Sequence, residues 1–181
     1  MALTLMLTGF KADCAVAADT PDIYHLHQGD KVLISVWREE TLQREVVVLP
    51  DGSITFPLIG RVVVAGLDTP EVERRLTTKL KEYLPDPVVT VTIASTDGNR
   101  AYVMGKVIHP GSLIISGPTT VLQAISIVGG FDKFADEGDI KVIRAKPDGQ
   151  EIFPVHYKDI ISGSDMSTNI QLKAGDTIVV P

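Results

Sequence analysis

Residues 24–36 read YHLHQGDKVLISV, and residues 48–60 read VLPDGSITFPLIG. In the first block, Gly29 and Asp30 predict a turn, because glycine accepts a positive φ and an aspartate can hydrogen-bond the backbone beside it. After Asp30, apolar residues alternate with mixed ones, which is the pattern of a strand with one buried face. The first block therefore predicts a turn that leads directly into a β-strand.

The second block predicts a hairpin. A β-rich run at 46–49 leads into Pro50-Asp51-Gly52, and another run follows at 54–56. Pro-Asp-Gly between two such runs is typical of a hairpin turn. We expect Pro57 to end the ladder because proline has no N–H to donate, and Gly60 to permit a tight backbone path.

In this order and at this spacing, the two blocks resemble the start of the polysaccharide export domain of outer-membrane polysaccharide exporters, the Wza-like family. The resemblance covers residues 18–96, which we expect to form the first domain. It implies a strand, a hairpin, a helix and a final strand, in that order.

The rest of this region agrees with that order. Asp68 or Thr69 can cap a helix that has Pro70 in its first turn and ends near Tyr83. Apolar residues spaced by four give the helix a buried stripe: Val72, Leu76, Leu80 and Leu84. Its charged residues are either a solvated face or a docking surface: Glu73, Arg74, Lys81 and Glu82. A β-branched strand is expected at 87–94.

Residues 97–181 resemble a second module. VMGKVIHPGSL at 103–113, followed by TTVLQAISIVGG at 119–130, is similar to the SLBB domain, a β-grasp-like module that follows the export domain in this family. The helix at 121–128 is apolar nearly all round, so we expect it to be buried. Pro147-Asp148-Gly149 predicts a second hairpin of the same kind as the first.

A turn-into-strand pattern occurs twice in the chain. Five residues of the first block have the same offsets as five residues near the C-terminus: Leu26, Gly29, Asp30, Val32 and Ile34 match Leu172, Gly175, Asp176, Ile178 and Val180. Two occurrences so far apart indicate a reused local device and not a tandem repeat.

The expected fold class is α+β, with two small mixed domains. The turns that carry the family resemblance lie at Gly29, Asp30, Pro50, Asp51, Gly52, Pro57, Gly60, Gly105, Pro110, Gly111, Gly129, Gly130, Gly175 and Asp176.

Composition is ordinary for a globular protein: 44% of the 181 residues are hydrophobic and 22% are charged. The formal net charge is -6, and no run of Lys and Arg is long enough to form a phosphate-binding stripe. We therefore expect no nucleic-acid partner.

Residues 1–17 predict a secretory signal peptide. An apolar run at 2–10 precedes Ala15-Val16-Ala17, a small-x-small cleavage pattern, although the usual basic start is absent. Cys14 is an alternative lipidation site, which Asp13 disfavours. Cleavage before Ala18 removes this only cysteine, so the exported chain could form no internal disulfide.

No later run approaches the roughly 18 apolar residues of a membrane span. We expect a soluble protein in the periplasm, associated with the outer membrane.

The sequence contains no phosphate-cradling loop, nucleophile elbow or zinc-binding helix, so we expect no enzyme, metal or cofactor. His25 and His27 lie on one face of an extended segment but have no obvious third ligand. Acidic residues that sugar chemistry would use in pairs occur in turns, where local hydrogen bonds account for them: Asp30, Asp51 and Asp176.

Aromatic residues are the candidates for contact with a glycan, because an exposed ring can stack on a sugar. The candidates are Tyr24, Trp37 and Tyr102, although an aromatic in an apolar strand is more often part of a core.

The family resemblance implies a function. Members form rings around a cavity through which capsular polysaccharide or exopolysaccharide passes, together with an inner-membrane polysaccharide co-polymerase. Longer members continue with a further SLBB module and a helix that crosses the outer membrane, whereas this sequence stops at Pro181. We therefore expect a short-form periplasmic adaptor and a separate outer-membrane β-barrel partner. The alternatives are a periplasmic glycan- or ligand-binding module without a conduit, and an enzyme that acts on glycan.

Overall fold

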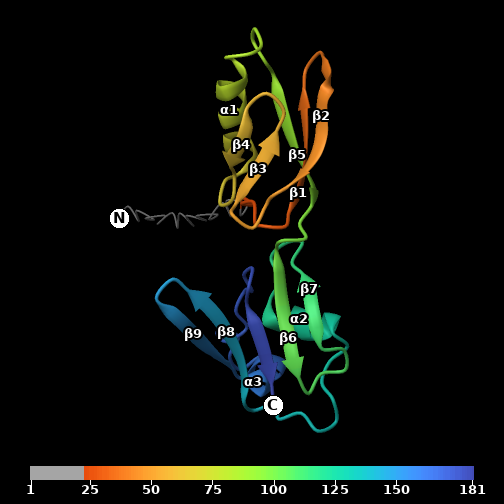
Figure 1. Ribbon diagram of the computed structural model, residues 1–181. Coiled ribbons are helices and arrows are strands. Elements are labelled where there is room, and N and C mark those ends of the chain that lie inside the picture. The colour runs from red at the N-terminus through yellow and green to blue at the C-terminus, as the bar shows by residue number, and fades with distance from the viewer. Residues whose placement is uncertain (1–22) are drawn as a thin grey trace, which may run out of the picture.

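The computed structural model describes residues 23–181, in which the chain forms two units joined by a short segment (Figure 1). Each unit has its own hydrophobic core, and each combines helices with sheets. The α+β class is therefore confirmed. The expected signal peptide and Cys14 lie outside the described residues.

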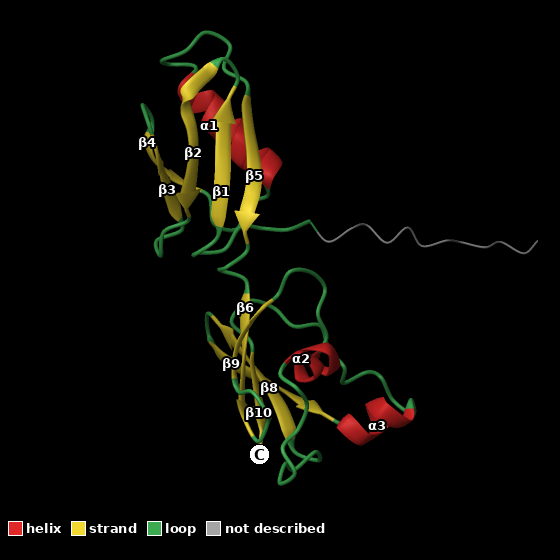
Figure 2. Cartoon of the chain, turned by 90° about the vertical axis from the view of Figure 1, so that its right-hand side faces the viewer, coloured by secondary structure: helices red, strands yellow, loops and turns green. Residues whose placement is uncertain are grey.

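The first unit contains two sheets and a helix. A three-stranded antiparallel sheet has the order β2-β1-β5: β2 is Glu39–Val47, β1 is Lys31–Val36 and β5 is Val89–Ser95. A two-stranded sheet pairs β3, Ser53–Phe56, with β4, Gly60–Val63. The helix α1, Thr69–Leu80, packs behind the three-stranded sheet (Figure 2).

Local sequence explains these elements. In β1 the alternate residues Val32, Ile34 and Val36 are buried, as the period-two pattern predicts. The Asp68 side chain caps α1 by accepting a 2.8 Å hydrogen bond from the Glu71 N–H. The apolar stripe of α1 enters the core through Val72, Leu76 and Leu80, which are fully buried.

The predicted hairpin at Pro50-Asp51-Gly52 is wrong. A tight turn exists there, because the Gly52 N–H donates to Leu49 O and the Leu49 N–H donates to Ser53 O. However, β2 pairs with β1 and β3 pairs with β4, so this turn carries the chain from one sheet to the other. The antiparallel pairs are instead β1 with β2 and β3 with β4, so β2 and β3 do not pair with each other.

The second unit is a five-stranded sheet with two helices on one side (Figure 2). The sheet order is β7-β6-β10-β8-β9, where β7 is Gly111–Ile114, β6 is Arg100–Gly105, β10 is Thr177–Val180, β8 is Ile140–Lys146 and β9 is Gly149–Val155. The helices are α2, Val121–Ile127, and α3, Tyr157–Ser162. Only β6 and β10 pair in parallel. Here the Pro-Asp-Gly hairpin does form, because Lys146 pairs with Gly149.

Helix α2 differs from the expectation that it is buried all round. Thr120 and Gln123 form a capping box at its start, and Val121, Ala124 and Ile125 face the core. Ile127, however, is 62% exposed. The helix lies against one face of the sheet only, so an apolar sequence on every side does not bury every side.

Each unit is small, and neither core reaches across the segment that joins them. The first core lies between α1 and the two sheets of its unit, and the second lies between the five-stranded sheet and its helices. Within residues 23–181, no helix has the length and apolar character needed to cross a membrane.

Candidate functional site

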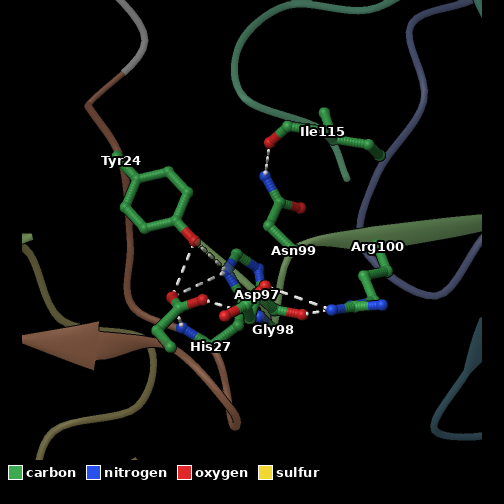
Figure 3. Close-up of polar contacts among 8 residues, drawn as sticks. Tyr24, His27, Asp97, Gly98, Asn99, Arg100 and Ile115 are labelled. Atoms are coloured by element: carbon green, nitrogen blue, oxygen red, sulfur yellow. Dashed lines mark hydrogen bonds and ion pairs between the residues drawn. The ribbon is translucent and has the colours of Figure 1, made fainter. Parts of the chain in front are cut away.

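The junction between the two units is built on a buried carboxylate. Asp30 has no exposed surface and accepts three hydrogen bonds. Its Oδ2 accepts from the Tyr24 hydroxyl at 2.6 Å and from the His27 N–H at 2.7 Å, and its Oδ1 accepts from the Gly98 N–H at 2.9 Å. The turn that opens the first unit therefore holds the backbone of the connecting segment (Figure 3).

Gly98 allows this contact because it has no side chain. A Cβ atom at this position would collide with the carbonyl oxygen of Gln28. Gly29, with φ of +94°, faces Gly98 from the other side of the contact. Two glycines thus let the backbones of the turn and the connecting segment approach closely.

The residues after Gly98 fasten the connecting segment to the second unit. Asn99 donates from its side chain to Ile115 O at 2.7 Å, and the Ile115 N–H donates to Asn99 O at 2.7 Å. Arg100 Nε donates to Asp97 O at 2.6 Å, and its guanidinium also pairs with the Asp97 carboxylate (Figure 3). The connecting segment is therefore bonded on both sides of Gly98.

The charge at the junction favours a protonated phenol. Burial raises the pKa of Tyr24 well above its ordinary value of 10.0, and the hydrogen bond to Asp30 raises it further. The Tyr24 hydroxyl thus stays a donor to Asp30. The His27 Nδ1 lies 3.3 Å from the Tyr24 oxygen and 3.9 Å from Asp30 Oδ2, so it extends the same polar cluster.

Two crevices flank the junction. One, of about 290 Å³, is lined by Tyr24, His25 and His27 from the first unit and by Asn99 and Lys173 among others from the second. The other, of about 380 Å³, includes Tyr102, which is 48% exposed. Together they offer aromatic faces and hydrogen-bond donors, which suit the rings and hydroxyl groups of a sugar.

The predicted aromatic contacts do not form one cluster. Tyr24 and Tyr102 lie in the two crevices at the junction. Trp37 is 71% exposed and follows the end of β1, in a separate hollow with Glu39 and Gln43. His25 and His27 share a crevice, but residues 23–181 contain no group of three or more potential metal ligands.

The predicted turn residues lie in both units and do not gather into a site. Asp51 accepts from the Ser53 N–H and hydroxyl and pairs with Arg61 at 2.8 Å, so these hydrogen bonds hold its pKa below the usual range. Asp176 is fully buried and paired with Arg144. The glycines of these turns have positive φ, including those in each Gly-Asp turn and the pair after α2: Gly29, Gly52, Gly60, Gly105, Gly111, Gly129, Gly130 and Gly175. Three prolines border these turns: Pro50, Pro57 and Pro110.

Sequence reasoning missed a basic groove between β4 and α1. Arg61 from the strand meets Arg74, Arg75 and Lys79 from the helix there. The helix charges were visible as a polar face, but Arg61 is separated from them in sequence. Only the packing of β4 against α1 brings the four cations together.

Comparison with known families matches nearly the whole described chain. The family model described as "Polysaccharide biosynthesis/export protein" matches residues 18–94, and the model described as "SLBB domain" matches residues 99–180.

Three curated relatives illustrate the similarity. The polysialic acid transport protein KpsD of Escherichia coli is 27% identical over 178 residues, which are 97% of this chain and 31% of KpsD. The EPS I polysaccharide export outer membrane protein EpsA of Ralstonia nicotianae is 30% identical over 135 residues, which are 74% of this chain and 35% of EpsA. The capsule polysaccharide export protein BexD of Haemophilus influenzae is 22% identical over 132 residues, which are 73% of this chain and 32% of BexD.

This chain spans about a third of the length of the curated relatives it matches. Both matched domains occur in it, the export domain first and the SLBB domain second. The chain therefore contains an export domain of the polysaccharide biosynthesis/export protein family, followed by an SLBB domain.

Proposed function

We propose that this protein is a periplasmic component of a bacterial export system for capsular polysaccharide or exopolysaccharide, in which copies assemble into a ring around the passing polymer. The two matched domains and the printed functions of the relatives support a role in export. Partner proteins in the inner and outer membranes complete the path at either end of this component.

The observation that carries the proposal is the bonded junction. Asp30 of the export domain accepts from Gly98, and Asn99 exchanges hydrogen bonds with Ile115 of the SLBB domain. These bonds fasten the connecting segment to both domains and restrict how the domains can be oriented. Copies arranged side by side would then build two stacked layers around a common opening, which two loosely tethered domains could not do.

The edges of the sheets are suited to a head-to-tail assembly. The edge strands of the three-stranded sheet are β2 and β5, and those of the five-stranded sheet are β7 and β9. A closed ring needs two different complementary faces on each copy. The two sides of the first sheet differ, because within residues 23–181 β2 has no strand partner on its outer side, whereas Glu73 of α1 accepts from the Val91 N–H of β5 at 2.8 Å.

The three acidic residues of the turns are not arranged for cleavage of a glycosidic bond. Asp30 already accepts three hydrogen bonds, and Arg144 neutralises Asp176. Asp51 is bonded to Ser53 and Arg61. A glycosidase-type mechanism needs a protonated carboxyl group and an ionised one that face each other across a sugar. Asp30, Asp51 and Asp176 do not form such a pair, because each is bonded to partners of its own.

Two measurements test this proposal. In a strain that lacks the gene, we expect polysaccharide to disappear from the cell surface and to accumulate in the periplasm. In light scattering across a concentration series, we expect the exported protein to form a discrete oligomer several times the 19.6 kDa chain. Unchanged surface polysaccharide in the deletion strain would contradict the proposal.

A binding module without a conduit is the second candidate. The crevices that contain Tyr24 and Tyr102 favour it, because they present rings and donors at the surface. A monomer at every concentration that still binds oligosaccharides would support this reading over the ring.

A further inference from the structure

The basic groove is an open hollow of about 660 Å³ between β4 and α1. Its lining comes from three residues of the strand and five of the helix: Arg61, Val62, Val63, Glu71, Arg74, Arg75, Thr78 and Lys79. Its apolar lining comes from Val62, which is buried, and Val63, which is exposed. Its walls are charged, so the groove differs in character from the crevices at the junction.

Positive charge is concentrated in this groove. Four of the chain's 17 Lys and Arg residues line it, although the chain as a whole has a net charge of -6. Glu71 is the only acidic residue in the lining, and it pairs with Arg75 at 3.2 Å. Within residues 23–181, Arg74 and Lys79 take part in no ion pair. The groove therefore has cationic groups available for an anionic ligand.

The edge of β4 adds backbone donors. β4 pairs only with β3 in its sheet, and the Val64 N–H donates to Gly52 O just beyond the ladder. In an antiparallel pair the bonds alternate, so with this register the backbone groups of Arg61 and Val63 point away from β3. Val63 O accepts from Arg75 Nη1 of α1 at 3.3 Å, which shows that this edge faces the helix. The N–H groups of the β4 edge are thus turned toward the groove.

The donors suit an anionic group such as a carboxylate. An arginine guanidinium binds a carboxylate through two parallel hydrogen bonds, and its charge persists at every physiological pH. The lining has no aromatic side chain, so it lacks the surface on which an uncharged sugar stacks. Cores of protein interfaces are also rich in aromatic residues, which makes a second protein a poorer match than an extended polyanion.

We propose that the groove between β4 and α1 binds carboxylate-bearing sugars of the exported polysaccharide, with Arg74 and Lys79 as the principal charged contacts. This inference rests on the proposed export function. The Arg74 and Lys79 side chains are exposed, so their contacts stay hydrated and are weakened by salt. Weak contacts that form and break rapidly suit a polymer that must move past the groove and not remain bound.

The test uses the purified protein and two probes at low ionic strength. One probe is an oligogalacturonate, and the other is the same oligosaccharide with its carboxyl groups reduced to alcohols. Calorimetry or NMR titration should detect binding of the oligogalacturonate and no binding of the reduced form. Equal binding of both probes, or of neither, would overturn the proposal.

Charge reversal locates the binding. Arg74→Glu should weaken oligogalacturonate binding by at least about tenfold, because it replaces a donor with a repelling carboxylate. Lys158→Glu is the matched control, since Lys158 is also an exposed helical cation but lies in α3 outside the groove. Both variants should unfold at the same temperature as the parent protein, because both side chains are exposed.

The remaining outcomes distinguish the two proposals. If Arg74→Glu leaves oligogalacturonate binding intact but changes the mass of the oligomer, the groove is a contact between copies and this inference is overturned. If Arg74→Glu binds and exports normally while the gene deletion still abolishes surface polysaccharide, the export function stands without an acidic-sugar site in this groove.

Discussion

The same turn opens the first strand of the export domain and the last strand of the SLBB domain. In the first, the His27 N–H donates to Asp30 Oδ2 at 2.7 Å and the Asp30 N–H donates to His27 O at 3.1 Å. In the second, the Lys173 N–H donates to Asp176 Oδ2 at 2.8 Å and the Asp176 N–H donates to Lys173 O at 3.1 Å. Both carboxylates are fully buried. The local geometry is thus the same in both turns.

The two turns differ in their distant partners. Asp30 accepts its remaining bonds from neutral donors, the Tyr24 hydroxyl and the Gly98 N–H of the connecting segment. Asp176 accepts from Arg144 Nε at 2.8 Å and Nη2 at 2.7 Å, and Arg144 lies on β8 of the same sheet. The hydrogen bonds to Asp176 raise the pKa of Arg144. One turn therefore joins domains and the other stabilises a sheet, although the sequence pattern is shared.

The largest expected effect comes from removing the charged partner. Arg144→Leu leaves Asp176 buried without a counter-charge, which should lower the free energy of unfolding of the SLBB domain by about 3–5 kcal/mol. Urea unfolding with a probe in each domain measures this loss. Lys146→Leu is the control, because the Lys146–Glu151 pair on the same hairpin is exposed and should contribute less than about 1 kcal/mol. Equal losses in the two variants would refute the distinction.

A smaller loss of stability is expected from a change at the Asp30 turn, and it should appear at the junction between the domains. In Asp30→Asn one side-chain oxygen is replaced by an NH₂ group that cannot accept, so at least one of three buried donors loses its partner. The free energy of unfolding should fall by about 1–3 kcal/mol. Amide exchange at Gly98 should accelerate as the junction opens.

Asp176→Asn is the matched comparison for this variant. It should destabilise the SLBB domain and leave the Gly98 amide as protected as in the parent protein, because Asp176 makes no bond to the connecting segment. Asp30→Ala removes both oxygens, so unchanged exchange at Gly98 in that variant would show that Asp30 does not hold the connecting segment.

Local signals in the sequence predicted the elements better than their pairing. The cap at Asp68 and the stripe through Val72 predicted the start and the buried face of α1, because both depend on residues within a few positions of each other, although the helix ends at Leu80 and not near Tyr83. Pro-Asp-Gly occurs twice, and the prediction of a hairpin is confirmed at residue 149 and wrong at residue 52. The tripeptide allows a sharp turn, but the choice of strand partner depends on strands elsewhere in the chain.

The candidate site shows the same limit. The buried turn at Asp30 was visible as a motif, whereas its partner Gly98 lies 68 residues away and carries no side-chain signal. The basic groove was missed because Arg61 and Arg74 belong to different elements. Periodicity reports which face of an element is polar, but it does not report which two polar faces adjoin.

The smallest expected effect concerns the neutral donor at the junction. The pKa of Tyr24 is raised in the folded protein, while in the unfolded chain the phenol ionises near its ordinary value of 10.0. The contribution of this hydroxyl to stability is therefore complete below about pH 10 and is lost as the pH rises above it, because only the unfolded state then releases the proton. Tyr24→Phe should cost about 1 kcal/mol at neutral pH and should flatten the fall in stability above pH 10.

Thermal unfolding from pH 7 to pH 11 measures this dependence for the parent protein and for Tyr24→Phe. Tyr102→Phe is the control, because the Tyr102 ring is half exposed and its hydroxyl makes no hydrogen bond within residues 23–181. This control should match the parent protein at neutral pH. The same alkaline fall in Tyr24→Phe as in the parent protein would mean that another group controls it. In that case, the difference between a neutral donor at Asp30 and a charged donor at Asp176 would not show in the pH dependence of stability.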